Sequence, residues 1–298
     1  MHAALEFWVR LHVDRLTGVA TGRPLRDDMC LPNPRCVTRD SLAAVQLAPD
    51  EWVVAPKTDG VRSLVVRATF MGAPLVAIVG RRYTVRVAWR GPPSAADDAV
   101  STVLDAEATA DGALSVHDVL VVGGAPVHAR PHHVRMDILA AAIDEVARGA
   151  DLPPIAPKPF APLTAAAVAA ALRAAGDGLI LAHSCRPVTF GSDPALLKWK
   201  PPNKCTIDLV VERRRCGAHY GRKARARAAD SGRVIVDEID VAAVPGDLPA
   251  IWEFGFRDGR WRPLHRRDDK AKANSLYVVE QTMHNVVDII RPDELAPT

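Results

Sequence analysis

The sequence predicts an α+β fold, in which a body of antiparallel strands with inserted helices is followed by a small β-barrel. Short strand-like segments are joined by Met71-Gly72 and by Asp111-Gly112, and both pairs are typical of β-hairpin turns. Two other segments have the apolar spacing and end signals of helices. After Lys200-Pro201-Pro202 the chain returns to short strand-like segments. Strands and helices therefore belong to one α+β protein.

The two hairpins predict the sheet of the first domain. Because a tight turn joins strands that run in opposite directions, this sheet is expected to be antiparallel. Its predicted strands are residues 61–70, 73–79, 102–109 and 114–122.

Two helices are expected after these strands. The first covers residues 134–148, and the second runs from an N-cap at Thr164 to a stop at Gly176. The Pro-rich stretch 152–162 is interpreted as the linker between them.

The last part of the chain predicts a second domain. Its length and short strands are those of a small barrel of about 80 to 100 residues. We set the boundary between domains 1–203 and 204–298, with the last helix able to pack back on the first domain. The predicted elements are strands 207–212, 233–241 and 251–257 and a helix over 275–290.

Composition excludes several classes of protein. With 298 residues, 48% of them hydrophobic, the chain can form a substantial core. No run approaches the roughly 18 to 20 apolar residues of a membrane span, and no signal peptide or anchor is expected. The five scattered cysteines lack paired C-x-x-C spacing and are expected to be reduced thiols of an intracellular protein. The net charge of +3 is mild, so nucleic-acid binding requires local basic clusters.

The hexapeptide Lys57-Thr58-Asp59-Gly60-Val61-Arg62 follows the strand-like residues 52–56 and suggests covalent nucleotidyl transfer. A lysine amine becomes a nucleophile when burial and neighbouring cations favour its neutral form. Asp59 can orient polar groups around a nucleotide, Gly60 permits close backbone approach, and Arg62 offers a fork for phosphate or ribose oxygens. The alternative is a polar turn with Lys57 as a solvated surface lysine.

Two further strands carry paired charges. A period of two places Asp105 and Glu107 on one strand face, where they can bind a divalent cation or orient ribose hydroxyls. The alternative is a solvent-facing edge. Lys198 and Lys200 share a side in the same way, which suits a triphosphate. Their alternative is a basic edge that discourages aggregation.

Two weaker signals complete the set. Asp177-Gly178 lies at a helix-to-strand turn, where glycine needs no functional reason. The charged cluster at residues 266–270, followed by Asn274, is by itself more typical of a solvated turn.

In this order, these motifs resemble those of the GTP:RNA guanylyltransferases, the mRNA capping enzymes of the covalent nucleotidyltransferase superfamily. The resemblance spans about residues 52 to 274 and is similar to the compact stand-alone enzymes of large DNA viruses. It rests on K-T-D-G-x-R, V-L-D-A-E, the strand with His117-Asp118, D-G-L-I-L, L-L-K-W-K-P and R-x-D-K-x-x-x-N.

The resemblance implies a fold and a reaction. The fold is an antiparallel-sheet nucleotidyltransferase domain of ATP-grasp-like, ligase type, followed by an OB-fold β-barrel. Lys57 is expected to attack the α-phosphate of GTP, releasing pyrophosphate, and the lysyl-bound GMP then passes to the diphosphate end of RNA to give a GpppN cap. Mg²⁺ or Mn²⁺ is the expected cofactor and GTP the substrate.

The resemblance also implies residue roles. Lys57 is the nucleophile, and Glu107 and Asp177 are the expected metal ligands. The expected nucleotide contacts are Thr58, Asp59, Arg62, Arg81, Glu107, His117, Lys198, Lys200, Arg267, Asp269 and Lys270.

The chain departs from the family pattern at four places. Gly80-Arg81 stands where an Asp-Arg pair is usual, so the ribose contact is Arg81 or Arg82. His117 replaces an aromatic residue that stacks on guanine. Ala106 replaces a glycine, and Ala273 replaces a proline. Neither alanine removes a functional group.

Alternatives remain open. An ATP-dependent DNA or RNA ligase would use the same lysine to carry AMP, and a non-catalytic RNA-binding relative would keep only the fold. The basic run 213–227 is expected to be a solvated loop or an RNA-binding segment. The expected partners are 5′-diphosphate RNA and, on other polypeptides, an RNA triphosphatase and a cap methyltransferase. We expect a monomer that binds no membrane and works in the nucleus, the cytoplasm or a viral replication site.

Overall fold

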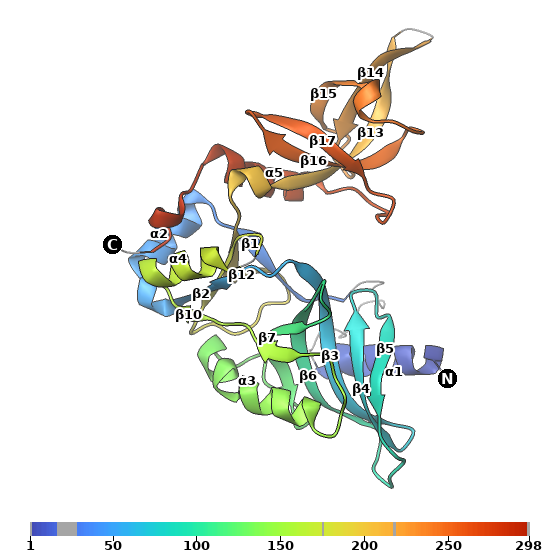
Figure 1. Cartoon of the computed structure of the whole chain (residues 1–298), viewed down its shortest axis with the longest axis vertical. Helices are drawn as coiled ribbons and strands as arrows, with labels where there is room; N and C mark the ends of the chain where they lie inside the picture. Colours follow the sequence, from blue (N-terminus) through green and yellow to red (C-terminus); the bar gives the residue numbers. More distant parts are fainter. Residues whose placement is uncertain (1, 17–28, 175, 217–218, 297–298) are drawn as a thin grey trace. The chain divides into compact units, whose positions relative to one another are not determined.

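The computed structural model describes residues 2–16, 29–174, 176–216 and 219–296 (Figure 1). The chain divides into two compact units. The predicted domain boundary between residues 203 and 204 stays a prediction, as does packing of the last helix on the first domain. The first unit comprises Met1–Arg35, Ala48–Lys198 and Ala296–Thr298, and the second comprises Cys36–Leu47 and Trp199–Leu295.

The described residues form fewer helices than strands. The second predicted helix has its N-cap where expected, because Thr164 Oγ1 accepts a hydrogen bond from the Ala167 N–H, but it ends before Gly176. No helix within the described ranges is long and apolar enough to cross a membrane. The α-helices are α1 His2–Leu16, α2 Arg39–Leu47, α3 His132–Ala147, α4 Ala165–Arg173 and α5 Leu276–Val287, and the 3₁₀ turns are η1 Pro49–Glu51, η2 Pro202–Lys204, η3 Val241–Ala243 and η4 Pro292–Glu294.

A seven-stranded sheet forms the largest part of the first unit. Its order is β5-β4-β3-β6-β7-β8, with β9 parallel to β7 and the other neighbours antiparallel. Both predicted hairpins are confirmed: Met71 and Gly72 turn with φ of 52° and 70°, and Gly112 with φ of 85°. Its strands are β3 Gly60–Phe70, β4 Ala73–Gly80, β5 Val85–Arg90, β6 Ala99–Thr109, β7 Leu114–Val122, β8 Ala125–Pro126 and β9 Ile155–Pro157.

Both faces of this sheet are covered by a helix (Figure 1). On one face Leu64 of β3 belongs to the same core cluster as Val9 of α1. On the other face Val65 belongs to a cluster that contains Leu139 of α3. Because successive strand residues point to opposite faces, both sets must be apolar. Helix α1 was not predicted from the sequence.

A five-stranded sheet completes the first unit and carries the predicted nucleophile. Strand β2 pairs antiparallel with β11 and β10. The stretch 152–162 is therefore not a plain linker, because β9 and β10 pair with sheet strands from within it. In the order β1-β12-β11-β2-β10, the strands are Pro32–Cys36, Gly191–Trp199, Leu179–His183, Trp52–Pro56 and Ala161–Pro162.

The second unit contains an antiparallel sheet of five strands in the order β15-β14-β13-β16-β17. This curled sheet is an OB-like half-barrel, and the predicted α+β class with a C-terminal β-domain is confirmed. Phe254 and Leu209 are fully buried in its core, where Val279 of α5 joins them. Its strands are β13 Thr206–Cys216, β14 His219–Arg227, β15 Val234–Asp240, β16 Ala250–Arg257 and β17 Arg260–Arg266.

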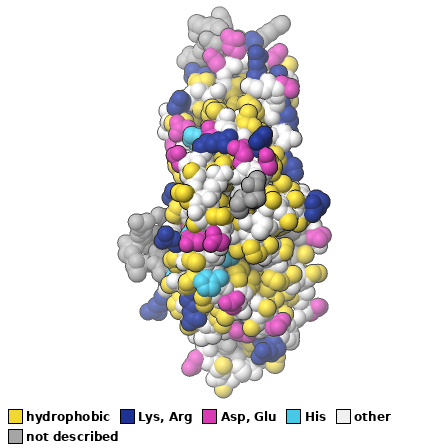
Figure 2. All heavy atoms as spheres, turned by 90° about the vertical axis from the view of Figure 1, so that its left-hand side faces the viewer, with side chains coloured by type: hydrophobic (Ala, Val, Ile, Leu, Met, Phe, Trp, Pro, Cys, Tyr) yellow, Lys and Arg dark blue, Asp and Glu magenta, His cyan; other side chains and the backbone are white. Residues whose placement is uncertain are grey.

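The expectation of a solvated loop over residues 213–227 is wrong. Most of this run forms the paired strands β13 and β14, and its strand pattern was obscured because the buried positions are small alanines, Ala224 and Ala226, set between charged side chains. Arg225 and Arg227 of β14 contact Glu212 at 2.8 and 3.2 Å. On the face shown in Figure 2, Lys and Arg side chains are interspersed with Asp and Glu, as the mild net charge suggests.

Candidate functional site

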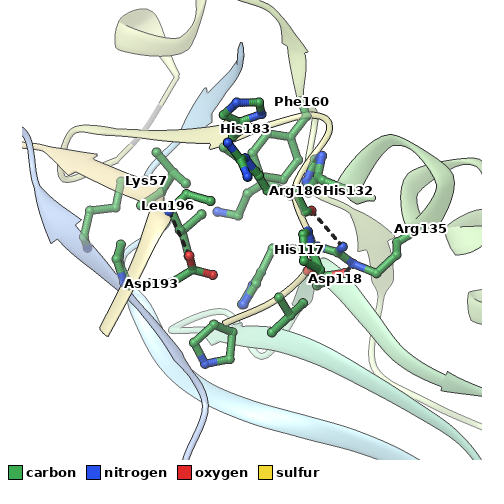
Figure 3. Close-up of a pocket in the computed structure, with 18 of the residues that line it drawn as sticks. Lys57, His117, Asp118, His132, Arg135, Phe160, His183, Arg186, Asp193 and Leu196 are labelled. Carbon is green, nitrogen blue, oxygen red and sulfur yellow. Dashed lines mark hydrogen bonds and ion pairs between the residues drawn. The ribbon is translucent and has the colours of Figure 1, made fainter. Parts of the chain in front are cut away.

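A pocket in the first unit brings together side chains that are far apart in the sequence (Figure 3). We call it the Lys57 pocket, because Lys57 lines it with three other predicted residues, Arg62, Glu107 and His117. In the view of Figure 3, Lys57 and Arg135 lie at opposite ends of the labelled group. Asp118, quoted above only as part of a motif, also lines the pocket, and lining residues not singled out from the sequence include His132, Arg135, Lys158, Phe160, His183, Arg186 and Asp193.

Lys57 directly follows β2 and is held by the turn before β11. Its N–H donates to the Gly178 carbonyl at 2.9 Å, and its carbonyl accepts from the Asp177 N–H at 3.0 Å. Its Nζ lies 3.1 Å from Asp177 Oδ2, and the two side chains are 20% and 19% exposed. Lys57 is therefore a largely shielded pocket lysine with a fixed backbone, not a solvated surface lysine.

Gly176 approaches the Lys57 backbone so closely that a side chain would collide with it. A Cβ at this position would lie 2.7 Å from the Lys57 carbonyl oxygen. Gly176→Ala is therefore expected to displace the turn and to lower the free energy of unfolding by about 1–3 kcal/mol. Urea denaturation of the two proteins measures this difference, and a change below about 0.5 kcal/mol would contradict the close approach.

Arg62 and Asp105 form a buried pair beside the pocket. Arg62 Nε donates to Asp105 Oδ1 at 2.9 Å, and Nη2 donates to Oδ2. Arg62 Nη1 donates to the Pro32 carbonyl at 2.5 Å. His117 Nε2 lies 3.1 Å from Asp105 Oδ1. Although burial opposes it, the charges of Arg62 and His117 hold the pKa of Asp105 well below its usual range. Asp105 therefore fixes the orientation of two predicted nucleotide-binding residues.

Asp105 and Glu107 point to the same face of β6, as predicted. The residues between and beside them, Leu104 and Ala106, belong to the core cluster on the opposite face. Asp105 is 0% exposed and β6 is an interior strand, so the alternative of a solvent-facing edge is wrong.

Glu107 and Asp177, the predicted metal ligands, offer two carboxylates and not a complete cage. No group of three or more His, Cys, Asp or Glu side chains in the described ranges is placed to hold a metal ion. Asp177 pairs with Lys57, and Glu107 shares the pocket with Lys57. Mg²⁺ at nucleotide sites commonly uses one or two carboxylates and takes its other ligands from phosphate and water. In chemistry, the two carboxylates are ligands of the type that Mg²⁺ prefers, with a nucleotide supplying the remaining oxygens.

Lys158 is the most unusual residue that sequence analysis missed. It is 6% exposed, and its Nζ donates to the Pro56 carbonyl at 3.0 Å and to Thr58 Oγ1 at 2.5 Å. Burial lowers the pKa of Lys158 to about 8, and the charge of Lys57 adds to this effect while that of Glu107 opposes it. The sequence signal was a lysine between two prolines, which was hidden in a stretch interpreted as a linker.

The far wall of the pocket combines an ion pair with aromatic rings. Arg135 donates to both oxygens of Asp118 at 2.7 and 2.8 Å. The rings of His132 and Phe160 meet edge to face with centroids 5.0 Å apart. Burial lowers the pKa of His132 to about 4, so its ring is neutral at physiological pH. This wall offers flat, uncharged surface next to fixed polar groups, as suits a nucleobase.

Four other predicted residues of the first unit lie outside the lining of the Lys57 pocket. Thr58 accepts from Lys158, while Asp59 is exposed in the loop before β3. Arg81 is exposed after β4, and its Nη2 lies 3.4 Å from Asn33 Oδ1. Lys198 is half-buried in β12 between buried Leu197 and Trp199. These four predicted side chains do not line the Lys57 pocket.

Arg267, Asp269 and Lys270 form a network in the second unit. Arg267 contacts Asp269 at 2.7 Å and both Asp208 and Glu253 at 3.1 Å, and Lys270 also contacts Asp208. The hydrogen bond from Arg267 lowers the pKa of Asp269 to about 2. The cluster is therefore an ordered charge network and not simply a solvated turn. Lys200 also belongs to this unit.

Comparison with known proteins finds a similar capping-enzyme subunit. No protein-family model matches the chain. The mRNA-capping enzyme subunit alpha of Schizosaccharomyces pombe is 26% identical over 159 residues, a match that covers 42% of this chain. The chain thus spans 36% of the length of that relative.

Solved structures similar to the chain include three DNA ligases. A Lig E DNA ligase has a TM-score of 0.40 and 14% identity, with 80% of this chain and 99% of that one covered. Mycobacterial DNA ligase D complexed with ATP and MES has a TM-score of 0.44 and 16% identity, with 80% and 94% covered. The ATP-dependent DNA ligase from bacteriophage T7 in complex with ATP has a TM-score of 0.42 and 12% identity, with 78% and 97% covered.

Proposed function

We propose that this chain, whose sequence match and motif order fit the covalent nucleotidyltransferase superfamily, is an mRNA guanylyltransferase. It transfers GMP from GTP, through Lys57, to the 5′-diphosphate end of RNA and forms a GpppN cap. The observation that carries the proposal is the shielded Lys57 in a pocket, with its backbone held by the turn at residues 176–178 and its Nζ 3.1 Å from Asp177.

In the first step, Lys57 acts as a nucleophile in its neutral form. Its Nζ attacks the α-phosphorus, so an N–P bond forms while the bond from that phosphorus to the bridging oxygen breaks. Pyrophosphate leaves with the electron pair of the broken bond. Asp177 Oδ2, 3.1 Å from Nζ, is placed to take the proton that the amine releases.

In the second step, the same groups work in reverse. An oxygen of the terminal phosphate of the RNA attacks the phosphorus of the adduct, and the N–P bond breaks. The Lys57 nitrogen takes a proton back from Asp177 as it leaves. The phosphorus moves from nitrogen to oxygen, and the free enzyme is regenerated.

Nucleotide recognition follows from the walls of the pocket. Glu107 can accept hydrogen bonds from ribose hydroxyls, and the fixed ring of His117 offers a face for guanine. Mg²⁺ or Mn²⁺ would be held by Glu107 and Asp177 together with the nucleotide, and it would offset the charge of the triphosphate. By resemblance to the family, the remaining contacts are assigned to Thr58, Asp59, Arg62, Arg81, Lys198, Lys200, Arg267, Asp269 and Lys270.

Two features favour capping over ligation. The chain is similar in sequence to a capping-enzyme subunit. The motif Lys198-Trp199-Lys200 and the cluster from Arg267 to Asn274 also follow the capping pattern, whereas ligases end in a different basic motif.

Label transfer tests the first step. The pure protein is incubated with Mg²⁺ and α-³²P-labelled GTP or ATP and is then run on a denaturing gel. We expect label from GTP, none from ATP and none with Lys57→Ala, while Lys223→Ala, a change at an exposed lysine of β14, labels like wild type. Label from ATP alone would make the protein a ligase-type enzyme, and no label from either would leave a binding-only relative.

The RNA acceptor tests the second step. Labelled enzyme is expected to pass GMP to RNA with a 5′-diphosphate end and not to RNA with a 5′-monophosphate end. Because the acceptor must first lose its γ-phosphate, we also propose that an RNA triphosphatase and a cap methyltransferase act from other polypeptides. Capping of triphosphate RNA by the chain alone would contradict the proposal that a separate triphosphatase is required.

A further inference from the structure

Lys158 is held rigidly at the edge of the Lys57 pocket. It lies between Pro157 and Pro159, which restrict the backbone on either side. Its N–H donates to the Val116 carbonyl of β7 at 2.6 Å, and its carbonyl accepts from the Phe160 N–H at 2.9 Å. The position of its side chain is therefore set by the sheet and not by a flexible loop.

The ammonium group of Lys158 forms hydrogen bonds with the residues on both sides of Lys57. Nζ donates at 3.0 Å to the carbonyl of Pro56, the residue before Lys57, and at 2.5 Å to the hydroxyl of Thr58, the residue after it. Together with the turn that holds the Lys57 backbone, these two bonds limit rotation of the peptide groups on both sides of the nucleophile. The direction in which the Lys57 side chain leaves the chain depends on those peptide groups.

Stability alone gives no reason for an ammonium at this position. Lys158 is 6% exposed, and within the described ranges it forms no ion pair. Burying a charge without a paired counter-charge is unfavourable, and a methionine of similar length would fill the same space without a charge. The lysine therefore lowers the stability of the fold in exchange for two directed hydrogen bonds next to Lys57.

We propose that Lys158 is a positioning residue for adduct formation, because it holds Pro56 and Thr58 so that the Lys57 amine points at the α-phosphorus. This inference rests on the proposed function, since its effect is on the rate at which the Lys57 adduct forms. Correct alignment of a nucleophile is worth orders of magnitude in rate, and small misplacements are costly.

The test is a double-mutant cycle on single-turnover label transfer, with Lys158→Met, Thr58→Val and both together. Lys158→Met is expected to lower the saturating rate by about 10- to 100-fold, while the half-saturating nucleotide concentration changes less than about threefold. Thr58→Val is expected to lower the rate by about three- to tenfold, and the double variant to be no slower than Lys158→Met. Lys223→Met, at an exposed lysine, serves as the matched control.

Several results of this experiment would overturn the proposed role of Lys158. An unchanged saturating rate in Lys158→Met, multiplicative effects in the double variant, or a loss seen only in the half-saturating concentration would overturn the positioning role. A changed preference between GTP and ATP would do the same, because it would make Lys158 a contact to the base. If Lys158→Met does not fold, Thr58→Val must lower the saturating rate while the half-saturating nucleotide concentration changes less than about threefold, because loss of a nucleotide contact alone would raise that concentration. Absence of adduct in wild type would refute the proposed function and this inference together, whereas a wild-type adduct with any overturning result refutes the inference alone.

Discussion

Asp105→Ala is expected to lower the free energy of unfolding by about 3–5 kcal/mol, the cost of leaving one member of a buried ion pair without its partner. Asp105 is 0% exposed and accepts hydrogen bonds from two nitrogens of Arg62, and His117 Nε2 lies 3.1 Å away. Without the carboxylate, the Arg62 guanidinium keeps one hydrogen-bond acceptor within the described ranges, the Pro32 carbonyl. Urea denaturation followed by circular dichroism measures the loss.

Two controls separate this effect from a general loss of acidic charge. Asp97→Ala removes an exposed carboxylate shortly before β6 and is expected to change stability by less than about 0.5 kcal/mol. Adding Arg62→Met to Asp105→Ala removes the orphaned cation and is expected to be less destabilising than the sum of the two single changes, with a coupling of about 0.5–3 kcal/mol. If the stability losses of Asp105→Ala and Arg62→Met simply add in the double variant, the ion pair between the two residues does not contribute to stability.

Local patterns made part of the fold and site predictable. Turn residues such as Gly112 and the period of two along β6 depend on neighbours in sequence, so the hairpins and the shared face of Asp105 and Glu107 could be derived without coordinates. The position of Lys57 directly after a strand was predictable for the same reason, because an apolar run that ends at Pro56 marks the end of β2.

Contacts between distant segments set the limits of prediction. The pairing of Lys57 with Asp177, which is 120 residues away, depends on β2 and β11 lying side by side, and sequence analysis assigned Asp177 only to a metal. Lys158 acquires its contacts through the parallel pairing of β9 with β7, in a stretch whose prolines suggested a linker. The pairing of Asp118 with Arg135 also requires the fold, because one lies on a strand and the other on a helix.

Lys57→Arg is expected to abolish adduct formation, with a loss of at least about 10³-fold in labelling, while the fold keeps its stability within about 0.5 kcal/mol. The variant retains a positive charge opposite Asp177, so the ion pair seen at 3.1 Å in the native chain can be kept. A guanidinium stays protonated at any pH at which proteins are folded, and it therefore has no lone pair to attack phosphorus.

Lys57→Arg therefore separates the charge of Lys57 from its nucleophilicity, which Lys57→Ala cannot do. Labelling with α-³²P-GTP gives the activity, thermal unfolding gives the stability, and Lys223→Arg controls for the substitution itself at an exposed position. If Lys57→Arg were labelled as wild type is, the covalent bond would lie on another residue, and the proposed roles of Asp177 and Lys158 would fail with it. Loss of labelling together with an intact fold leaves the amine of Lys57 as the group that the reaction requires.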